Sequence, residues 1–285
     1  MKAIKSILTF AAVLFTAGIL AIGSCCFYAF KIEPYRIERK EYFLKEKEEE
    51  MPGIKVVQFS DVHIKEGFTG ENLEAVVEKI NEQNPDVILF TGDLYDNYSV
   101  YHEDETVITQ LSDLHASYAK LAVWGNRDYG GGAARQYESV MEQSGFTVLK
   151  NESRSIVLGN GKKLLITGLD DSLLGNPYLP ESEKDSDSDY KILLTHEPDT
   201  AEEYLDSGYD LILSGHSHGG QIDIPFLPQV NETALAATKL ASEYSRGMYD
   251  LSSERDVKLY VNTGIGTTHI PARFGVIPEI AVFYI

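Results

Sequence analysis

At 285 residues, with 24% charged residues, the chain has the length and composition of one sizeable globular domain and a formal net charge of −19. So acidic a surface argues against non-specific binding of nucleic acid, which depends on neutralisation of phosphates by Lys and Arg. An anionic substrate would therefore need cations at its own binding site. Cys25 and Cys26 are the two cysteines of the chain, so neither a disulfide nor a thiolate metal site is expected beyond the N-terminal region.

The N-terminal region, residues 1–30, is predicted to attach the protein to a membrane. Residues 7–30 contain no charged side chain and are long enough to span a bilayer as a helix. An uncleaved anchor is our first interpretation. A cleaved signal peptide beginning at Lys2 and Lys5 is the alternative, and the sequence IGSC resembles a lipoprotein cleavage site that would leave Cys25 lipidated.

The charges beside this segment give conflicting indications of orientation. Basic residues are more numerous after it than before it, which favours a cytoplasmic main domain by the positive-inside rule. The short, signal-like N-terminus favours export instead. We predict a location at the cell membrane with the main domain outside the cytoplasm. Residues 31–52 are predicted to form a charged stalk, and residues 53–285 a single domain.

From residue 54 onward, the hydrophobic pattern alternates between strands and helices. Leu73, Val76, Val77 and Ile80 share one helical face. Further helices are predicted at 103–118, at 134–145 with Gly145 as C-terminal cap, and at 199–207. A hairpin at 154–168 turns at Asn160-Gly161, and other strands are expected at 54–59, 86–90, 120–124, 191–195, 210–214, 257–263 and 279–285. This pattern predicts an α/β domain, with a largely buried sheet covered by helices.

Five of the predicted strands are followed by side chains that can bind metal ions: Asp61 and His63, Asp93, Asn126, His196, and His216 with His218. The carboxyl ends of strands in open α/β sheets are where ligands gather. Each motif alone has a structural explanation, such as a turn or a helix cap. Their succession along one chain instead predicts a site for two metal ions, with Asp93 bridging them.

The ordered motifs Asp-x-His, Gly-Asp, Gly-Asn-x-Asp, His and Gly-His-x-His resemble those of the calcineurin-like metallophosphoesterase superfamily over residues 54–285. The runs GHSHGGQI, YVNTGIGTTHIPARFG and PEIAVFYI are similar to a membrane-associated bacterial branch related to UDP-2,3-diacylglucosamine hydrolases. The resemblance implies a four-layer αββα sandwich. It also implies two metal sites, one formed by Asp61, His63, Asp93 and His218, and the other by Asp93, Asn126, His196 and His216.

Manganese, iron and zinc all suit these carboxylate, amide and imidazole ligands. Two divalent ions about 3.5–4 Å apart can clamp a phosphoryl group and activate a hydroxide. We therefore expect a membrane-anchored, dinuclear metal-dependent phosphohydrolase that cleaves a phosphodiester or diphosphate of a small-molecule or lipid-linked substrate. A broad phosphomonoesterase is one alternative, and a non-catalytic metal-binding surface protein is another.

Arg127 stands where many members of the superfamily have a histidine, and in this the chain resembles the UDP-2,3-diacylglucosamine hydrolases. Arginine can grip phosphate oxygens but does not donate its proton at neutral pH. His269 is a candidate for the missing general acid, with a role in loop structure as its alternative. For Arg127, the alternative to a catalytic role is pairing with a surface carboxylate such as Asp128.

Overall fold

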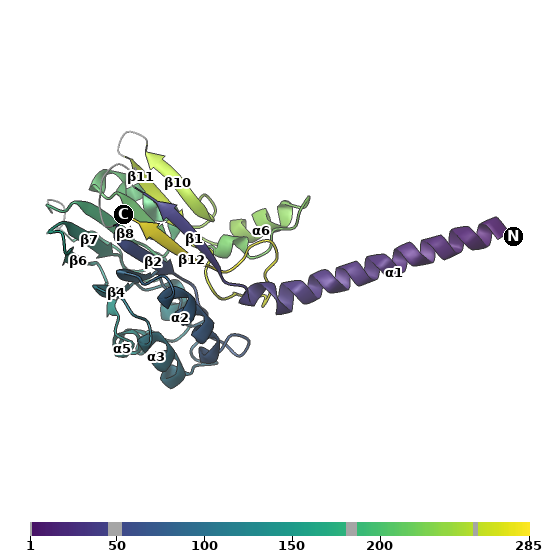
Figure 1. Ribbon diagram of the computed structural model, residues 1–285, viewed down its shortest axis with the longest axis horizontal. Helices are drawn as coiled ribbons and strands as arrows, with labels where there is room; N and C mark the ends of the chain where they lie inside the picture. The colour runs from purple at the N-terminus through teal and green to yellow at the C-terminus, as the bar shows by residue number, and fades with distance from the viewer. Residues whose placement is uncertain (1, 45–52, 181–186, 253–255) are drawn as a thin grey trace.

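Two six-stranded β-sheets face each other in the computed structural model, which describes residues 2–44, 53–180, 187–252 and 256–285 (Figure 1). The first sheet has the order β1-β12-β2-β3-β4-β5, with β1 (Glu38–Phe43), β2 (Lys55–Phe59), β3 (Val87–Phe90), β4 (Ala119–Ala122), β5 (Thr147–Val148) and β12 (Glu279–Tyr284). The second has the order β10-β11-β9-β8-β7-β6, with β6 (Glu152–Val157), β7 (Lys163–Gly168), β8 (Tyr190–Leu194), β9 (Leu211–Ser214), β10 (Gly247–Ser252) and β11 (Val257–Val261).

Helices cover the outer faces of both sheets, so the domain has four layers. The first sheet packs against α2 (Leu73–Asn81), α3 (Asp104–Ser112) and α5 (Tyr137–Gln143). The second packs against η4 (Pro198–Ser207), a 3₁₀-helix, and the inner faces of the two sheets form a third apolar core. Because the central strands are buried on both faces, they are continuously apolar, as in the fully buried VILF of β3. The predicted αββα sandwich is confirmed.

Most of the predicted elements are present, although some bounds differ. All four residues predicted to share a face of α2 are buried. The predicted hairpin is β6–β7, and Gly161 has the positive φ of 84° that its turn requires. The predicted helix 103–118 ends at Ser112. Ser117 and Tyr118 donate their backbone N–H groups to the carbonyls of Pro85 and Asp86, so the chain there already runs alongside the region leading into β3.

The predicted stalk is partly incorporated into the first sheet, which corrects our description of residues 31–52. Strand β1 pairs in parallel with β12, from Glu38 opposite Glu279 to Phe43 opposite Tyr284. The side chain of Tyr42 packs on Phe283, with ring centroids 5.6 Å apart. The charged residues of β1 obscured this strand in the sequence, because an edge strand can expose its polar side chains to water. Residues 45–52 lie outside the described part of the chain.

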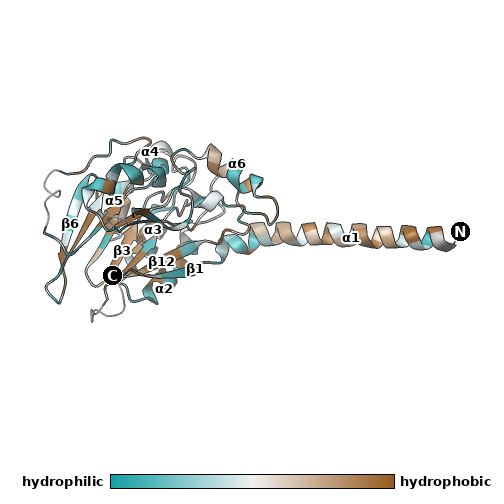
Figure 2. Cartoon of the chain, turned by 90° about the horizontal axis from the view of Figure 1, so that it is seen from above, coloured by the Kyte–Doolittle hydropathy of each residue, from teal (hydrophilic) through white to brown (hydrophobic). Residues whose placement is uncertain are grey.

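Helix α1 (Lys2–Lys31) extends away from the domain, and apolar residues occur along its length (Figure 2). The segment Ile4–Tyr35 reaches a mean hydropathy of 2.2 over 18 residues, none of which is buried. It is long and apolar enough to cross a membrane, a property that a signal sequence shares. At its base, the Ala29 carbonyl accepts a hydrogen bond of 2.9 Å from the backbone N–H of Arg273. The helix therefore joins the domain beside the loop between β11 and β12.

Candidate metal centre

The predicted ligands meet at one rim of the sandwich, where strands of both sheets end. Strands β2, β3 and β4 run parallel in the first sheet, and β8 and β9 run parallel in the second. At this rim the buried side chain of Gln58 donates to the Ser214 carbonyl at 3.0 Å, which links β2 to β9. The rim therefore consists of the ends of three strands of the first sheet and two strands of the second, so both sheets contribute to it.

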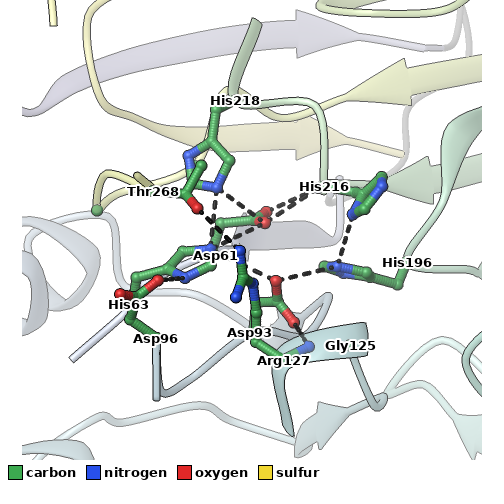
Figure 3. Close-up of polar contacts among 12 residues, drawn as sticks. Asp61, His63, Asp93, Asp96, Gly125, Arg127, His196, His216, His218 and Thr268 are labelled. Carbon is green, nitrogen blue, oxygen red and sulfur yellow. Dashed lines mark hydrogen bonds and ion pairs between the residues drawn. The ribbon is translucent and has the colours of Figure 1, made fainter. Parts of the chain in front are cut away.

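The turns that follow these strands have unusual backbone conformations. Five of the predicted ligands have positive φ angles of about 49–68°, namely Asp61, His63, Asp93, His216 and His218. Such left-handed conformations are uncommon for residues other than glycine, and they concentrate at functional sites. Here they turn the side chains back toward a common space at the rim (Figure 3).

Two glycines allow these turns to pack closely together. A Cβ atom at Gly125 would lie 2.3 Å from Oδ1 of Asp93, and one at Gly215 would lie 2.2 Å from Oδ2 of Asp61. Any side chain at either position would displace a carboxylate of the site. The glycines of these motifs therefore leave room for groups from neighbouring strands.

Six of the predicted ligands form two groups of three, and the potential ligand atoms within each group lie within 4.8 Å of one another. In the first group, Nε2 of His63 lies 2.9 Å from Nε2 of His218, which lies 3.5 Å from Oδ1 of Asp61. The second group consists of Asp93, His196 and His216. There, Nε2 of His196 lies 3.3 Å from Nδ1 of His216.

Asp93, a member of the second group, also lies against the first. Its Oδ2 atom is 3.4 Å from Nε2 of His63 and also 3.4 Å from Nε2 of His196. Its other oxygen, Oδ1, accepts a hydrogen bond of 2.7 Å from the backbone N–H of Arg127, which fixes the carboxylate (Figure 3). A single carboxylate oxygen thus lies at the same distance from a histidine of each group.

The outer ring nitrogens of three histidines have polar partners that orient the rings. Nδ1 of His196 lies 2.6 Å from the Thr91 carbonyl, and Nε2 of His216 lies 2.8 Å from the Lys239 carbonyl. Each nitrogen that faces a carbonyl must carry its hydrogen to donate, which leaves the opposite nitrogen free to bind a metal. Nδ1 of His63 faces the carboxylate of Asp96 at 3.3 Å, close enough for a charge contact although no hydrogen bond is formed.

The ionisation of the buried groups also suits a cation at the site. Burial lowers the pKa of His218 and of His216, and the neighbouring imidazoles lower both further. Burial would likewise lower the pKa of His63 and His196, but the nearby carboxylates outweigh it and raise both. Each facing pair thus combines one imidazole that favours a proton with one that does not. A metal ion bound between the facing nitrogens of a pair would satisfy both without a proton.

Asn126 supplies a further sign that the site fits metal ions. Its buried Oδ1 atom has no hydrogen-bond partner among the described residues, a costly arrangement unless a ligand fills it. The residue is the first of α4 (Asn126–Gly130), whose N-terminal cap is Gly125, so capping does not explain it. Carboxylate, amide and imidazole donors together suit divalent transition ions.

Arg127 and His269 both line a cavity of about 630 Å³ beside the two groups. The guanidinium of Arg127 lies 3.4 Å from Oγ1 of Thr268 and 3.4 Å from Nε2 of His269. His269 is exposed and has a positive φ of 51°. Asp128, considered above as a surface partner of Arg127, is instead fully buried and accepts hydrogen bonds from three backbone N–H groups.

Arg273 is a residue of this region whose role the sequence analysis missed. It is fully buried, and its guanidinium donates to the carbonyls of Thr263, Gly264 and Gly266 behind Asp61 and His218. Burial lowers its pKa to about 10, which still leaves it charged at neutral pH. Arg273 belongs to the run TTHIPARFG, which the sequence analysis singled out. No rule of spacing distinguishes a buried structural arginine from an exposed one. Asp96, three residues after Asp93, was missed as well.

Comparison with known proteins agrees with this geometry. Residues 54–220 match the calcineurin-like phosphoesterase family. The chain is 42% identical over 270 residues to the Bacillus subtilis metallophosphoesterase YkuE, covering 94% of this chain and 92% of that protein. It is 32% identical over 218 residues to the Campylobacter jejuni metallophosphoesterase Cj0846, covering 75% of this chain but 54% of that longer protein. UDP-2,3-diacylglucosamine pyrophosphatase LpxG of Chlamydia trachomatis is 26% identical over 294 residues, with 84% and 86% covered.

Proposed function

Because the chain belongs to the calcineurin-like phosphoesterase family of metal-dependent hydrolases, we propose that it is a membrane-anchored phosphohydrolase that cleaves a phosphodiester or diphosphate of a lipid-linked substrate. The observation that carries this proposal is the position of Asp93, with one oxygen 3.4 Å from a histidine of each group. The relative LpxG is named as a pyrophosphatase of a diacylated sugar nucleotide, which supports the choice of a lipid-linked diphosphate.

In this proposal the seven ligands are divided between two sites. One ion would be held by Asp61, His63, Asp93 and His218, and the other by Asp93, Asn126, His196 and His216, which adds a shared Asp93 and the unpartnered Asn126 to the two groups of three. Manganese, iron or zinc would polarise the phosphoryl group there and provide a nucleophile from water at neutral pH. The chain itself contributes the fixed carboxylate of Asp93 and the orientation of the imidazoles.

Arg127 is the residue placed to hold the substrate phosphate. Its backbone N–H is bonded to Asp93 and its guanidinium reaches the cavity, so its charge is fixed close to both groups. We assign it to a phosphate oxygen that gains charge during the reaction. We assign the proton donor for the leaving group to His269, which lines the same cavity; its Nε2 atom faces the Arg127 guanidinium at 3.4 Å.

The activity can be tested with the full chain in detergent and three substrates: bis(p-nitrophenyl) phosphate, p-nitrophenyl phosphate and a lipid-linked diphosphate. We expect the diphosphate and the diester to be hydrolysed faster than the monoester, with loss of activity on chelation and recovery on addition of Mn²⁺. A preference for the monoester would make the protein a phosphomonoesterase. If none of the three substrates is hydrolysed with metal present, an enzymatic role would be contradicted.

Location at the membrane is the other part of the proposal, and α1 supports it by its length, hydropathy and exposure. We place the catalytic domain outside the cytoplasm. Protease added to intact cells should then digest the domain while α1 stays with the membrane fraction. A domain that resists protease until the membrane is opened would place it in the cytoplasm, as the basic residues after α1 favour.

A further inference from the structure

The cavity beside the metal centre has a polar end and an apolar end. The polar end consists of the metal-binding groups and Arg127. The apolar end is formed largely by α6 (Gln229–Ala237), a helix that the sequence analysis did not predict. Val230, Ala234 and Ala237 lie on one face of α6 and line the cavity, although no residue of this helix is buried. A ligand filling the whole cavity would therefore combine a phosphate with an apolar group.

The turn before α6 presents a phenylalanine fully to solvent. In the sequence Ile224-Pro225-Phe226-Leu227-Pro228, Phe226 is 99% exposed and Leu227 is 53% exposed. The backbone N–H of Leu227 donates to the Ile224 carbonyl at 3.0 Å, which closes the turn. Phe226 has a positive φ of 69°, an unfavourable conformation for a bulky side chain. A strained turn that holds an aromatic ring in water indicates a partner that covers the ring.

The position of this turn favours a lipid bilayer as that partner. Helix α6 and α1 lie at the same end of the domain in two perpendicular views, whereas β6 lies at the opposite end (Figures 1 and 2). Another exposed apolar side chain at the cavity, Ile270, belongs to the loop whose Arg273 is bonded to the base of α1. If α1 spans a membrane, the turn and the apolar end of the cavity are held near its surface.

Charge near the turn is consistent with apolar rather than electrostatic docking. Arg246 is paired with Asp223 at 2.7 Å, so its charge is largely neutralised. Apart from the basic residues that follow α1 and from Lys239 at the cavity, the chain is strongly acidic and offers little attraction to an anionic surface. Contact of the turn itself with the bilayer would therefore come from its apolar side chains, with α1 as the tether.

We propose that the turn Ile224–Pro228 and α6 form a membrane-docking lip that inserts into the bilayer surface, and that the apolar end of the cavity receives the hydrocarbon chain of a phosphate-bearing membrane lipid. This inference rests on the proposed function, because it requires α1 in the membrane and a phosphoesterase at the metal centre. It adds the route by which the substrate arrives, directly from the bilayer and past α6.

Depth of insertion provides a test that does not depend on activity. Phe226→Trp and Val157→Trp variants of the full chain are placed in phosphatidylcholine nanodiscs whose acyl chains carry bromine. Val157 is the matched control, since it is 63% exposed and lies on β6 at the far end of the domain. The chain has one native tryptophan, Trp124, so each variant is compared with the unsubstituted chain. We expect bromine to quench the new tryptophan at position 226 several-fold more than the one at 157.

Equal quenching at the two positions would overturn the docking lip. A blue-shifted emission at position 226 without bromine quenching would mean that a protein, such as a second copy of the chain, covers the turn, and would overturn it as well.

The effect on substrate access is tested with two esters that share a leaving group: a phosphatidyl p-nitrophenyl ester in phosphatidylcholine vesicles, and water-soluble bis(p-nitrophenyl) phosphate. For Phe226→Asp, the ratio of the lipid rate to the soluble rate should fall by about tenfold, while Val157→Asp leaves it unchanged. An unchanged ratio in Phe226→Asp would overturn the inference. Failure of the unsubstituted chain to hydrolyse the soluble ester would instead contradict the proposed function, and the quenching result would stand separately.

Discussion

The metal centre and the α6 lip border the same cavity but are built in opposite ways. The predicted metal ligands follow strand ends, are buried or, for Asn126, half-buried, and several are held by hydrogen bonds to backbone groups. Helix α6 contributes no buried residue, and Asn231 is its polar attachment to the loop carrying His218. The comparison suggests that the reaction chemistry is fixed by the rigid part of the fold. Substrate choice is then left to a part that can move or vary with little cost to stability.

The largest effect is expected where the two metal groups meet. Asp93→Asn should lower the hydrolytic rate by about a thousandfold or more, because it removes the charge placed between both groups. His216→Ala should have a similar effect, and both variants should lose bound metal as measured by elemental analysis. Near-UV circular dichroism should remain native-like, because the strands that carry these residues are packed independently of the ligands.

Persistence of wild-type activity after complete chelation would contradict a metal-dependent mechanism. The rim could then no longer be described as the catalytic part and the lip as the part that selects the substrate. Asp93→Asn and His216→Ala should also lose activity equally on soluble and lipid esters, since the metal centre acts on every substrate.

The second prediction concerns Arg127, which lies between the rim and the cavity. Arg127→Ala should lower kcat by about 10²–10³-fold with unchanged metal content, as expected for one electrostatic contact to the transition state. Arg127→Lys should recover part of this loss, because it retains the charge but not the planar fork. Arg127→His should introduce a new pH dependence near the pKa of histidine if it restores turnover. Wild-type kcat/KM in the alanine variant would show that Arg127 does not act in catalysis.

The sequence predicted the rim better than the lip for physical reasons. Strands β2, β3, β8 and β9 are largely apolar runs followed closely by potential ligands, with a glycine beside the ligand after β3 and β9, a pattern that depends on local chemistry. The seven predicted ligands all lie at the rim, and the predicted helical face of α2 is buried. That two sheets contribute to the rim could not be deduced from the spacing of motifs, because it depends on pairing between distant strands.

Helix α6 and strands β1 and β10 are among the elements that were missed, because their side chains follow no clear pattern. Helix α6 packs no residue into the core, so its sequence lacks a strong apolar stripe. Strand β1 is a charged edge strand, and β10 is another edge strand with half-exposed residues.

Arg273 carries a charge but is fully buried, contrary to the usual preference of arginine for the surface. Only the tertiary arrangement supplies the carbonyls that it binds.

A third, smaller effect is expected at Asp96, which orients His63 from behind. Burial alone would raise the pKa of Asp96, but His63 outweighs it and holds the value at about 2, so the carboxylate is ionised at neutral pH. Asp96→Asn should weaken metal binding by about 10–100-fold, the usual effect of losing such a partner. Titration of the metal-free protein with Mn²⁺ measures this. The matched control is Asp104→Asn, whose carboxylate accepts hydrogen bonds from Tyr95 and Tyr98 instead.

Because the Asp96 carboxylate has a lowered pKa, its contribution is present above the ordinary pKa of an aspartate and is lost as the pH falls toward about 2. The difference in metal affinity between the wild type and Asp96→Asn should therefore be full at pH 7 and shrink in acid. A difference that grows as the pH falls would contradict this role of Asp96.

The smallest effect is expected at Asn231, where the lip is attached to the rim. Its Nδ2 atom donates to the carbonyls of Gly219 at 2.8 Å and Ile222 at 3.2 Å. Asn231→Ala removes both bonds, each worth about 0.5–1.5 kcal/mol, and should loosen α6 without moving the metal ligands. We expect KM for a lipid-embedded ester to rise about three- to tenfold, with kcat and metal content nearly unchanged.

Asn81→Ala is the matched control, because Asn81 also donates to a backbone carbonyl, that of Asp113, but lies on α2. It should lower the melting temperature without changing KM. If Asn231→Ala lowered kcat and metal content together, α6 would be needed to hold the metal ligands in place. The separation of a rigid catalytic rim from a variable lip would then be wrong.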